Sequence, residues 1–290
     1  MRAELALLTA ITITTATETE EAIKYTLWSR QCKLAKMLKS SSKNAAAQLS
    51  ATRSNINTLT LTATKLEIYA LARPADGKAR AATALALAAE AAAAAQLIKL
   101  KQQTDKAIKA VGYGHAGAAF ITGFYQLLAS NDNSNNAYCL DSSGGNANGA
   151  GEMTTLGCSA TSDNVFVAGP GPDPGDLQAT GFAHNDEVTS TSGQGTRSKC
   201  GFLKTAATLQ SNAGFYSTRP ANDKGLAHGL LTLNGANNPI APALTDLSGK
   251  ADDPALGFWH KAHAAAQAAA NEKSITINND ETQRLKDLAR

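Results

Sequence analysis

Residues 18–72 read ETEEAIKYTLWSRQCKLAKMLKSSSKNAAAQLSATRSNINTLTLTATKLEIYALA, without a glycine or a proline. Apolar side chains recur along this stretch at steps of mostly four and seven residues, the a/d spacing of a heptad seam. The seam residues are Ile23, Leu27, Leu34, Leu38, Ala45, Leu49, Ile56, Leu59 and Leu66. The pattern predicts one helix over residues 18–72, a rod of roughly 75 Å.

The next segment predicts a tight reversal of the chain. Pro74 disfavours helical backbone at Arg73, and Gly77 accepts a positive φ. A second helix is predicted over residues 78–111, and helical character resumes over 116–129 as its continuation. Two long helices joined by a short turn are antiparallel neighbours, so we expect a helical hairpin stalk.

The composition changes abruptly after Ser130. Residues 131–257 are rich in Asn, Gly, Ser, Thr and Pro, which favours loops and short strands. Helical sequence returns over residues 254–272 and begins again at 280–290. We therefore expect a mainly α protein. Its parts are a coiled-coil hairpin stalk (18–130), a loop-rich head with short β elements (131–253) and C-terminal helices (254–290).

Composition also excludes several classes of protein. The net charge is +3 and no run of Lys or Arg provides a stripe for phosphates, so no nucleic-acid partner is expected. No apolar stretch reaches the roughly 18 residues that a membrane-spanning helix needs. Aromatic residues make up only 5% of the chain, and alanine buries little area, which favours an elongated helical body over a compact α/β enzyme.

The first residues have the pattern of a processing segment. Arg2 precedes a short apolar run from Leu5 to Ile13, and small residues follow at 14–16. We expect residues 1–17 to be a signal peptide for the secretory route, with a frayed N-terminal arm as the alternative.

Four cysteines fit a secreted protein: Cys32, Cys139, Cys158 and Cys200. They form no CxxC pair, so neither a zinc ribbon nor a thioredoxin-like redox site is expected. Four cysteines permit three disulfide connectivities, and their spacing does not choose among them. Four unpaired thiols in a cytosolic protein are the alternative.

Residues 112–117 (GYGHAG) match the dinucleotide-binding pattern GxGxxG letter for letter. That motif works where a strand enters the turn and a helix leaves it, whereas the sequence before Gly112 is polar and helical. A helix kink or close helix packing explains these glycines better, so no cofactor is expected.

No catalytic or metal-binding cluster stands out elsewhere in the sequence. His260 and His263 lie three apart on one predicted helix without a third ligand, and Asp252-Asp253-Pro254 suits a helix cap. The other histidines are isolated in the sequence: His115, His184 and His228. No serine lies in a G-x-S-x-G elbow. We therefore expect no enzyme activity and no metal site. N-x-S/T is absent, so N-glycosylation is not expected either.

Three segments and the order of the cysteines carry a family resemblance. The segments are residues 28–35 (WSRQCKLA) early in the first helix, 65–70 (KLEIYA) near the turn, and 118–124 (AAFITGF) on the return helix. One cysteine precedes the hairpin turn and three follow it, which is the most specific part. Over about residues 18–270 the sequence resembles the N-terminal domain of the class A trypanosome variant surface glycoproteins.

The resemblance implies an antigenically variable coat protein at the cell surface, reached by the secretory route. Such proteins form homodimers and pack as a dense monolayer on the cell surface. Each stands on a stalk with a glycosylphosphatidylinositol (GPI) anchor, which is its contact with the membrane. Their sequences vary, which evades host antibodies. The family's pairing implies the disulfides Cys32–Cys158 and Cys139–Cys200. The cysteine-rich C-terminal domain and the anchor signal have no counterpart in these residues, so we expect 18–290 to be the N-terminal domain.

A surface receptor for a host serum protein on the same scaffold is the alternative function. A receptor needs an exposed apolar patch or a groove in the head. The aromatic residues of the head are sparse, which favours the coat: Tyr138, Phe166, Phe182, Phe202, Phe215 and Tyr216.

A two-helix stalk leaves apolar surface uncovered, because each helix covers only one stripe of the other. A second, weaker apolar row is formed by Ala22, Met37, Leu61 and Ile68 on the first helix and by Leu87, Ile98 and Leu100 on the second. Two-fold pairing would bury it with the same residues from both chains. We expect a homodimer whose contact includes the second helix and the upper lobe; a monomer covered by its C-terminal helices is the alternative.

Overall fold

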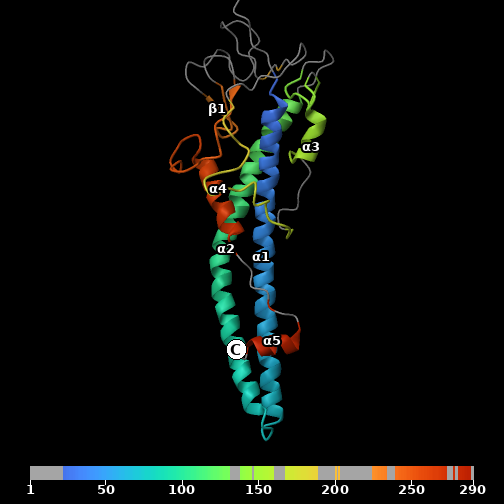
Figure 1. Cartoon of the computed structure of the whole chain (residues 1–290), viewed down its shortest axis with the longest axis vertical. Helices are drawn as coiled ribbons and strands as arrows, with labels where there is room; N and C mark the ends of the chain where they lie inside the picture. The colour runs from blue at the N-terminus through green and yellow to red at the C-terminus, as the bar shows by residue number, and fades with distance from the viewer. Residues whose placement is uncertain are drawn as a thin grey trace, which may run out of the picture.

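The computed structural model describes residues 22–130, 138–145, 147–159, 167–188, 200, 202, 224–233, 239–272, 277 and 280–288. Two long helices, α1 (Tyr25–Ala72) and α2 (Ala79–Ala129), form an antiparallel hairpin (Figure 1). The other elements are η1 (Ala150–Glu152), α3 (Met153–Leu156), β1 (Lys224–Leu226), β2 (Leu231–Leu233), β3 (Pro239–Ile240), α4 (Gly257–Ala270) and α5 (Glu281–Leu288). The predicted fold class, a mainly α hairpin with a loop-rich head, is confirmed.

The first helix begins later than predicted. Ile23 donates its backbone N–H to the Cys139 carbonyl (2.8 Å) and accepts the N–H of Asp141 (3.0 Å), so the chain here is extended beside Leu140. Because these backbone groups are engaged outside a helix, α1 starts at Tyr25 and not at Glu18. Residues 18–21 and the expected signal peptide lie outside the described residues.

The predicted reversal between the long helices is stabilised by one carboxylate. Asp76 accepts the Tyr69 hydroxyl (2.6 Å) and the backbone N–H of Lys78 (2.9 Å), and the Arg73 guanidinium lies 5.5 Å from the Tyr69 ring centroid. The Tyr69 hydrogen bond is the main reason that the pKa of Asp76 is lowered.

Burial along the hairpin follows the predicted seam but decreases toward the turn. The seam residues from Leu27 to Ala45 are buried, whereas in the lower half Leu59 is buried but Leu49, Ile56 and Leu66 are only half-buried. The buried positions of α2 in this lower half hold small or polar side chains: Ala82, Ala86, Ala89, Gln96, Gln103, Ala107 and Ala110. Alanine permits close helix contact but buries little apolar area, so the lower seam is thin.

The main hydrophobic core lies at the other end of the hairpin, under the head. Its largest fully buried side chains include Trp28, Tyr125, Phe182 and Trp259. α4 packs mainly on α2 and also contacts α1. The three short strands form one antiparallel sheet in the order β1-β2-β3, with Leu226 opposite Leu231.

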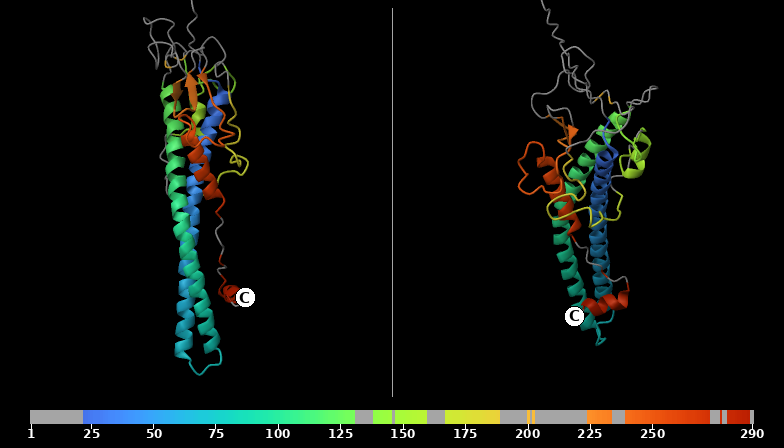
Figure 2. Two further views of the ribbon diagram at one scale, coloured as in Figure 1. Left: turned by 90° about the vertical axis from the view of Figure 1, so that its left-hand side faces the viewer. Right: turned by 45° about the horizontal axis from the view of Figure 1, so that its top comes forward.

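The helix predicted over residues 254–272 is shorter than predicted, whereas residues 289–290 at the end of the last one lie outside the described residues. The Asp253 carboxylate accepts the backbone N–H groups of Ala255 and Leu256 (2.8 and 3.0 Å), but this cap closes a turn, and α4 itself begins at Gly257. α5 contacts α2 beside the lower stalk, toward the hairpin turn (Figures 1 and 2). The last described residues therefore lie near the opposite end of the molecule from the head.

Candidate functional site

The glycines of the GxGxxG match lie inside α2, which continues through them without a strand or a turn. A Cβ atom at Gly114 would lie 2.8 Å from the Leu38 carbonyl oxygen, and one at Gly117 would lie 2.9 Å from Leu38 Cδ1. The Ser42 hydroxyl also donates to the Ala110 carbonyl (3.3 Å) across this contact. Of the two explanations offered by the sequence, the structure shows close packing of α1 and α2.

His263 joins α4 to the loop that precedes the sheet. Its Nε2 lies 2.8 Å from the Gln178 carbonyl oxygen, and its ring packs edge-on against Phe182, with centroids 5.1 Å apart. Burial lowers the pKa of His263, and the Gln178 hydrogen bond only partly opposes that shift. The buried imidazole is therefore a neutral packing and hydrogen-bonding group.

The remaining histidines are not brought together either. The His228 ring lies 4.1 Å from Phe120 and 5.2 Å from Phe258, between centroids, while His115 is half-buried on α2 and His184 is exposed. Within the described ranges, no group of three or more His, Cys, Asp or Glu side chains could hold a metal ion.

One disulfide holds the head to the hairpin and a second joins two segments of the head. Cys32 of α1 is bonded to Cys158, with Cα atoms 5.0 Å apart, and Cys139 is bonded to Cys200, with Cα atoms 4.4 Å apart. All four cysteines are buried in the main core. These pairs are the ones that the family resemblance implies, and both lie at the head end of the molecule.

Most of the large apolar side chains that the structure leaves exposed lie on the lower stalk. We call this set the stalk face: Leu61, Ile68, Leu71, Leu87, Leu97, Ile98 and Ile108. Leu87 and Ile108 lie three heptads apart and so occupy equivalent positions on α2. Ala22 and Met37, which the sequence placed in this row, are instead buried at the head end, and Leu100 is half-buried.

α2 is also long and apolar enough to cross a membrane, judged by length and composition alone. The sequence-based exclusion of such a segment is therefore wrong, because alanine runs raise hydropathy without large side chains. In this structure 28% of the most apolar window is buried, and α2 pairs with α1. A single helix of this kind is weak evidence for a membrane span.

The sequence profile described as trypanosome variant surface glycoprotein (A-type) matches residues 5–289. The chain belongs to this family. Variant surface glycoprotein MITAT 1.4A of Trypanosoma brucei brucei is 30% identical over 168 residues, 58% of this chain and 32% of that protein. Variant surface glycoprotein ILTAT 1.24 of the same organism is 27% identical over 162 residues, 56% of this chain and 31% of that protein. The chain thus spans about a third of the length of these relatives.

Among solved structures, the structure of MITat 1.1 superposes with a TM-score of 0.68 at 19% identity. The match covers 93% of this chain and 77% of that chain, so the two share a fold.

The apolar pattern missed the polar side chains that complete the seam of this variant surface glycoprotein. Gln31 lies between Leu27 and Leu34 at heptad spacing, and its Nε2 donates to the Leu230 carbonyl (3.0 Å). Its Oε1 accepts the Tyr125 hydroxyl (2.5 Å), whose pKa is raised by burial so that it stays a neutral donor. The gap in the heptad between Leu27 and Leu34 was the available signal for Gln31.

Proposed function

We propose that this chain is the N-terminal domain of an antigenically variable coat protein that stands on the cell surface with its head outward. The observation that supports this proposal most is that the two ends of the molecule differ in how they are stabilised. Helices of 48 and 51 residues form a stalk of roughly 75 Å, and the disulfides and the main core lie only at the head end. A dense layer of such rods would hinder host antibodies from reaching the membrane.

The position of α5 supports this orientation. α5 lies beside the lower stalk, so a C-terminal domain and lipid anchor that followed it would start from the hairpin end. The head loops would then face the host, where sequence changes in loops leave the paired helices intact.

The stalk face supports a homodimer as part of the same proposal. Seven large apolar side chains of the two stalk helices are exposed, and a contact with another molecule would bury them. A second copy would cover it by two-fold pairing along α2, and Leu127, which is exposed on α2 near the head, would extend the contact toward the upper lobe.

Antibody access to live cells tests the coat. One antibody would be raised against head residues 167–188 and another against turn residues 73–78, both selected for binding the purified folded chain. On live trypanosomes expressing the full-length protein, we expect the head antibody to bind and the turn antibody to be excluded. Equal binding of both, or no surface binding of either, would contradict the proposal.

Light scattering at micromolar concentration tests the homodimer. We expect about twice the 30.0 kDa of one chain, and a return to one chain in the double variant Leu87→Lys/Ile98→Lys. Thr155→Lys, on an exposed position of α3, controls for the added charge. A wild-type mass near 30.0 kDa would count against the dimer.

The disulfide pairing is part of the domain proposal. Peptide mapping of the secreted protein without reduction is expected to recover Cys32 linked to Cys158 and Cys139 linked to Cys200. A peptide that links Cys32 with Cys139 would refute this connectivity.

The receptor alternative gains no support from the described part of the head. Tyr138 and Phe182 are buried and Phe202 is half-buried, whereas the remaining head aromatics lie outside the described residues: Phe166, Phe215 and Tyr216. Recovery of one stoichiometric host protein from serum by the purified chain would reverse this preference.

A further inference from the structure

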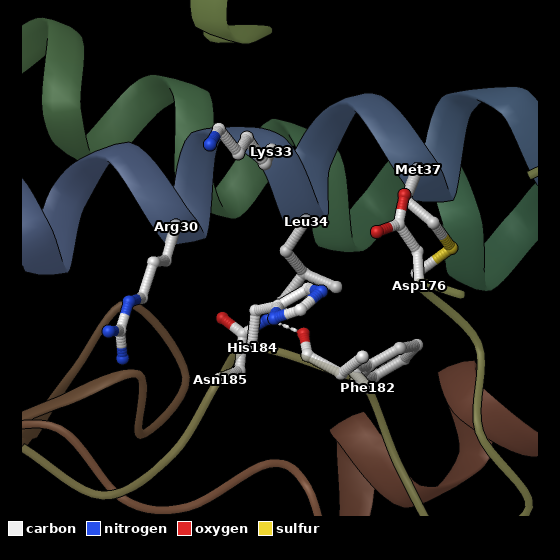
Figure 3. Close-up of a pocket in the computed structure, with 9 residues that line it drawn as sticks. Arg30, Lys33, Leu34, Met37, Asp176, Phe182, His184 and Asn185 are labelled. Atoms are coloured by element: carbon white, nitrogen blue, oxygen red, sulfur yellow. Dashed lines mark hydrogen bonds between the residues drawn. The ribbon is translucent and has the colours of Figure 1, made fainter. Parts of the chain in front are cut away.

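A cavity of about 260 Å³ lies between the first turns of α1 and the loop over residues 176–185 (Figure 3). Arg30, Lys33, Leu34 and Met37 line it from the helix. The loop contributes Asp176 and residues 182–185. Pockets for small organic ligands begin at about 300 Å³, so this space suits a compact molecule.

The apolar wall of the cavity is fixed in place. Leu34, Met37 and Phe182 are buried, and all three belong to the main core. Phe182 donates its backbone N–H to the Leu244 carbonyl (2.8 Å), and the Leu244 N–H returns to the Asn185 carbonyl (2.7 Å). A ligand would therefore meet a preorganised surface and would not have to order the loop.

The side chains at the rim favour an anion. Arg30 and Lys33 face a single carboxylate, Asp176, among the residues that line the cavity. On the helix side no acidic residue opposes these two cations, because α1 carries no Asp or Glu before Glu67. A negatively charged ligand could therefore pair with a cation at the rim.

Arg30 is available to a ligand at little cost. Its Nη1 lies 3.9 Å from Asp186 Oδ2, with both side chains substantially exposed (40% and 67%). Such exposed pairs contribute little to stability, so an incoming carboxylate can replace Asp186 as the partner of Arg30. The nearby Asp176 and Asp186 disfavour a doubly charged phosphate and therefore favour a monoanion.

His184 of the cavity wall lies in the left-handed region of backbone conformation. It adopts a φ of 63°, which is unfavourable for a residue other than glycine and is often found at ligand-binding positions. Figure 3 shows its imidazole beside Leu34, between Arg30 and Phe182. The ring therefore forms part of the wall that a bound molecule would touch.

We propose that this cavity binds a small organic monocarboxylate, with its carboxylate at Arg30 and an aromatic ring or short alkyl chain against Leu34, Met37 and Phe182. A fork of guanidinium N–H groups matches the geometry of a carboxylate, and the buried apolar wall matches the hydrocarbon part. This site is independent of the stalk face and of the proposed coat function.

The test uses 4-phenylbutyrate and its neutral analogue 4-phenylbutyramide as matched probes. We expect calorimetry of the whole chain in low-salt buffer to give a dissociation constant of about 1 mM or tighter for the carboxylate. Binding of the amide should be at least about tenfold weaker, because it lacks the charge-assisted hydrogen bonds.

Arg30→Gln should weaken carboxylate binding by about tenfold or more and leave the amide unaffected. Arg53→Gln removes an exposed cation from the same helix outside the cavity and should change neither affinity. Circular dichroism checks that both variants keep the wild-type fold. Equal affinity for the two probes, no binding of the carboxylate, or an equal loss in Arg53→Gln would overturn the proposal.

Discussion

The two ends of the helical hairpin are held together by different kinds of side chain. At the head end, α1 and α2 enclose Trp28 and Tyr125, one disulfide ties the head to α1, and a second lies within the head. In the stalk, the smaller core cluster consists of alanines with one half-buried leucine: Ala45, Ala107, Ala110, Ala269 and Leu49. Seven other large apolar residues of the stalk are exposed, as the stalk face.

This difference separates two tasks that one hairpin performs. Hydrophobic stabilisation scales with apolar area, so the aromatic head core stabilises the single chain far more than the alanine seam does. The stalk keeps its apolar area on the outside, where only another molecule can bury it. We infer that the head end stabilises the monomer and that the lower stalk provides the surface for self-association.

The largest expected effect comes from truncating the head core. Trp28 is fully buried, and its Nε1 donates to the Asp141 carbonyl (2.8 Å). Trp28→Ala should lower the free energy of unfolding by about 3–5 kcal/mol in urea titrations followed by circular dichroism. Leu97→Ala, on the stalk face, should change it by no more than about 0.5 kcal/mol at concentrations where the chain is monomeric. A similar loss of unfolding free energy in both variants would contradict the proposed difference between the head core and the stalk face.

Two glycines of α2 test where the helices are in close contact. Gly114→Ala places a Cβ atom against the Leu38 carbonyl and should destabilise the fold by about 1–3 kcal/mol. A Cβ atom added at Gly112 would have no neighbouring atom within 4 Å, so Gly112→Ala should stabilise the helix by up to about 1 kcal/mol. Thermal unfolding compares the two, and destabilisation by both would contradict the contact geometry.

A polar side chain in the stalk seam gives a smaller effect. Gln96 is buried and its Oε1 has no hydrogen-bond partner, which is unfavourable in an apolar seam. Gln96→Leu should raise the free energy of unfolding by about 1 kcal/mol in urea titrations. Gln102→Leu, an exposed position on the same helix, should leave it within about 0.5 kcal/mol. A loss of stability in Gln96→Leu would show that the polar seam position is satisfied.

The smallest effect concerns pH and the attachment of α4. The folded pKa of His263 is lowered below its ordinary value of 6.5, so in mildly acidic solution the unfolded chain binds a proton more readily than the folded one. Stability from this site is present above pH 6.5 and is lost as the pH falls toward the folded pKa. Differential scanning calorimetry between pH 7.5 and 5 should show a falling midpoint that His263→Gln flattens. An equally steep fall of the midpoint in His263→Gln would contradict this assignment.

The sequence predicted the long elements well because their signals are local. The heptad seam and the Pro74–Gly77 turn placed the end of α1 and the start of α2 at or next to their observed positions. The start of α1 was wrong because Ile23 pairs with residues far along the chain, and local periodicity carries no information about such a contact. The burial of Gln31 and Thr52 was not predicted, because a pattern of apolar residues does not by itself identify buried polar ones.

The sites were less predictable for the same reason. The stalk face was only partly predicted, since Met37 lies in the same apolar row but is covered by the head. The cavity proposed to bind a monocarboxylate is lined by Arg30 and by a loop more than a hundred residues later in the chain. The sequence around His184 gave no signal for its positive φ. Such features depend on how the head folds back over α1.

Hydrogen exchange measured by mass spectrometry at two protein concentrations tests the division of tasks most directly. At low concentration, we expect peptides from α1 residues 25–42 to exchange far more slowly than those from residues 56–71. Raising the concentration should slow exchange in the lower stalk, as the stalk face is covered by a second copy, and leave the buried residues 25–42 of α1 unchanged. Uniform protection along α1 at both concentrations would contradict the account.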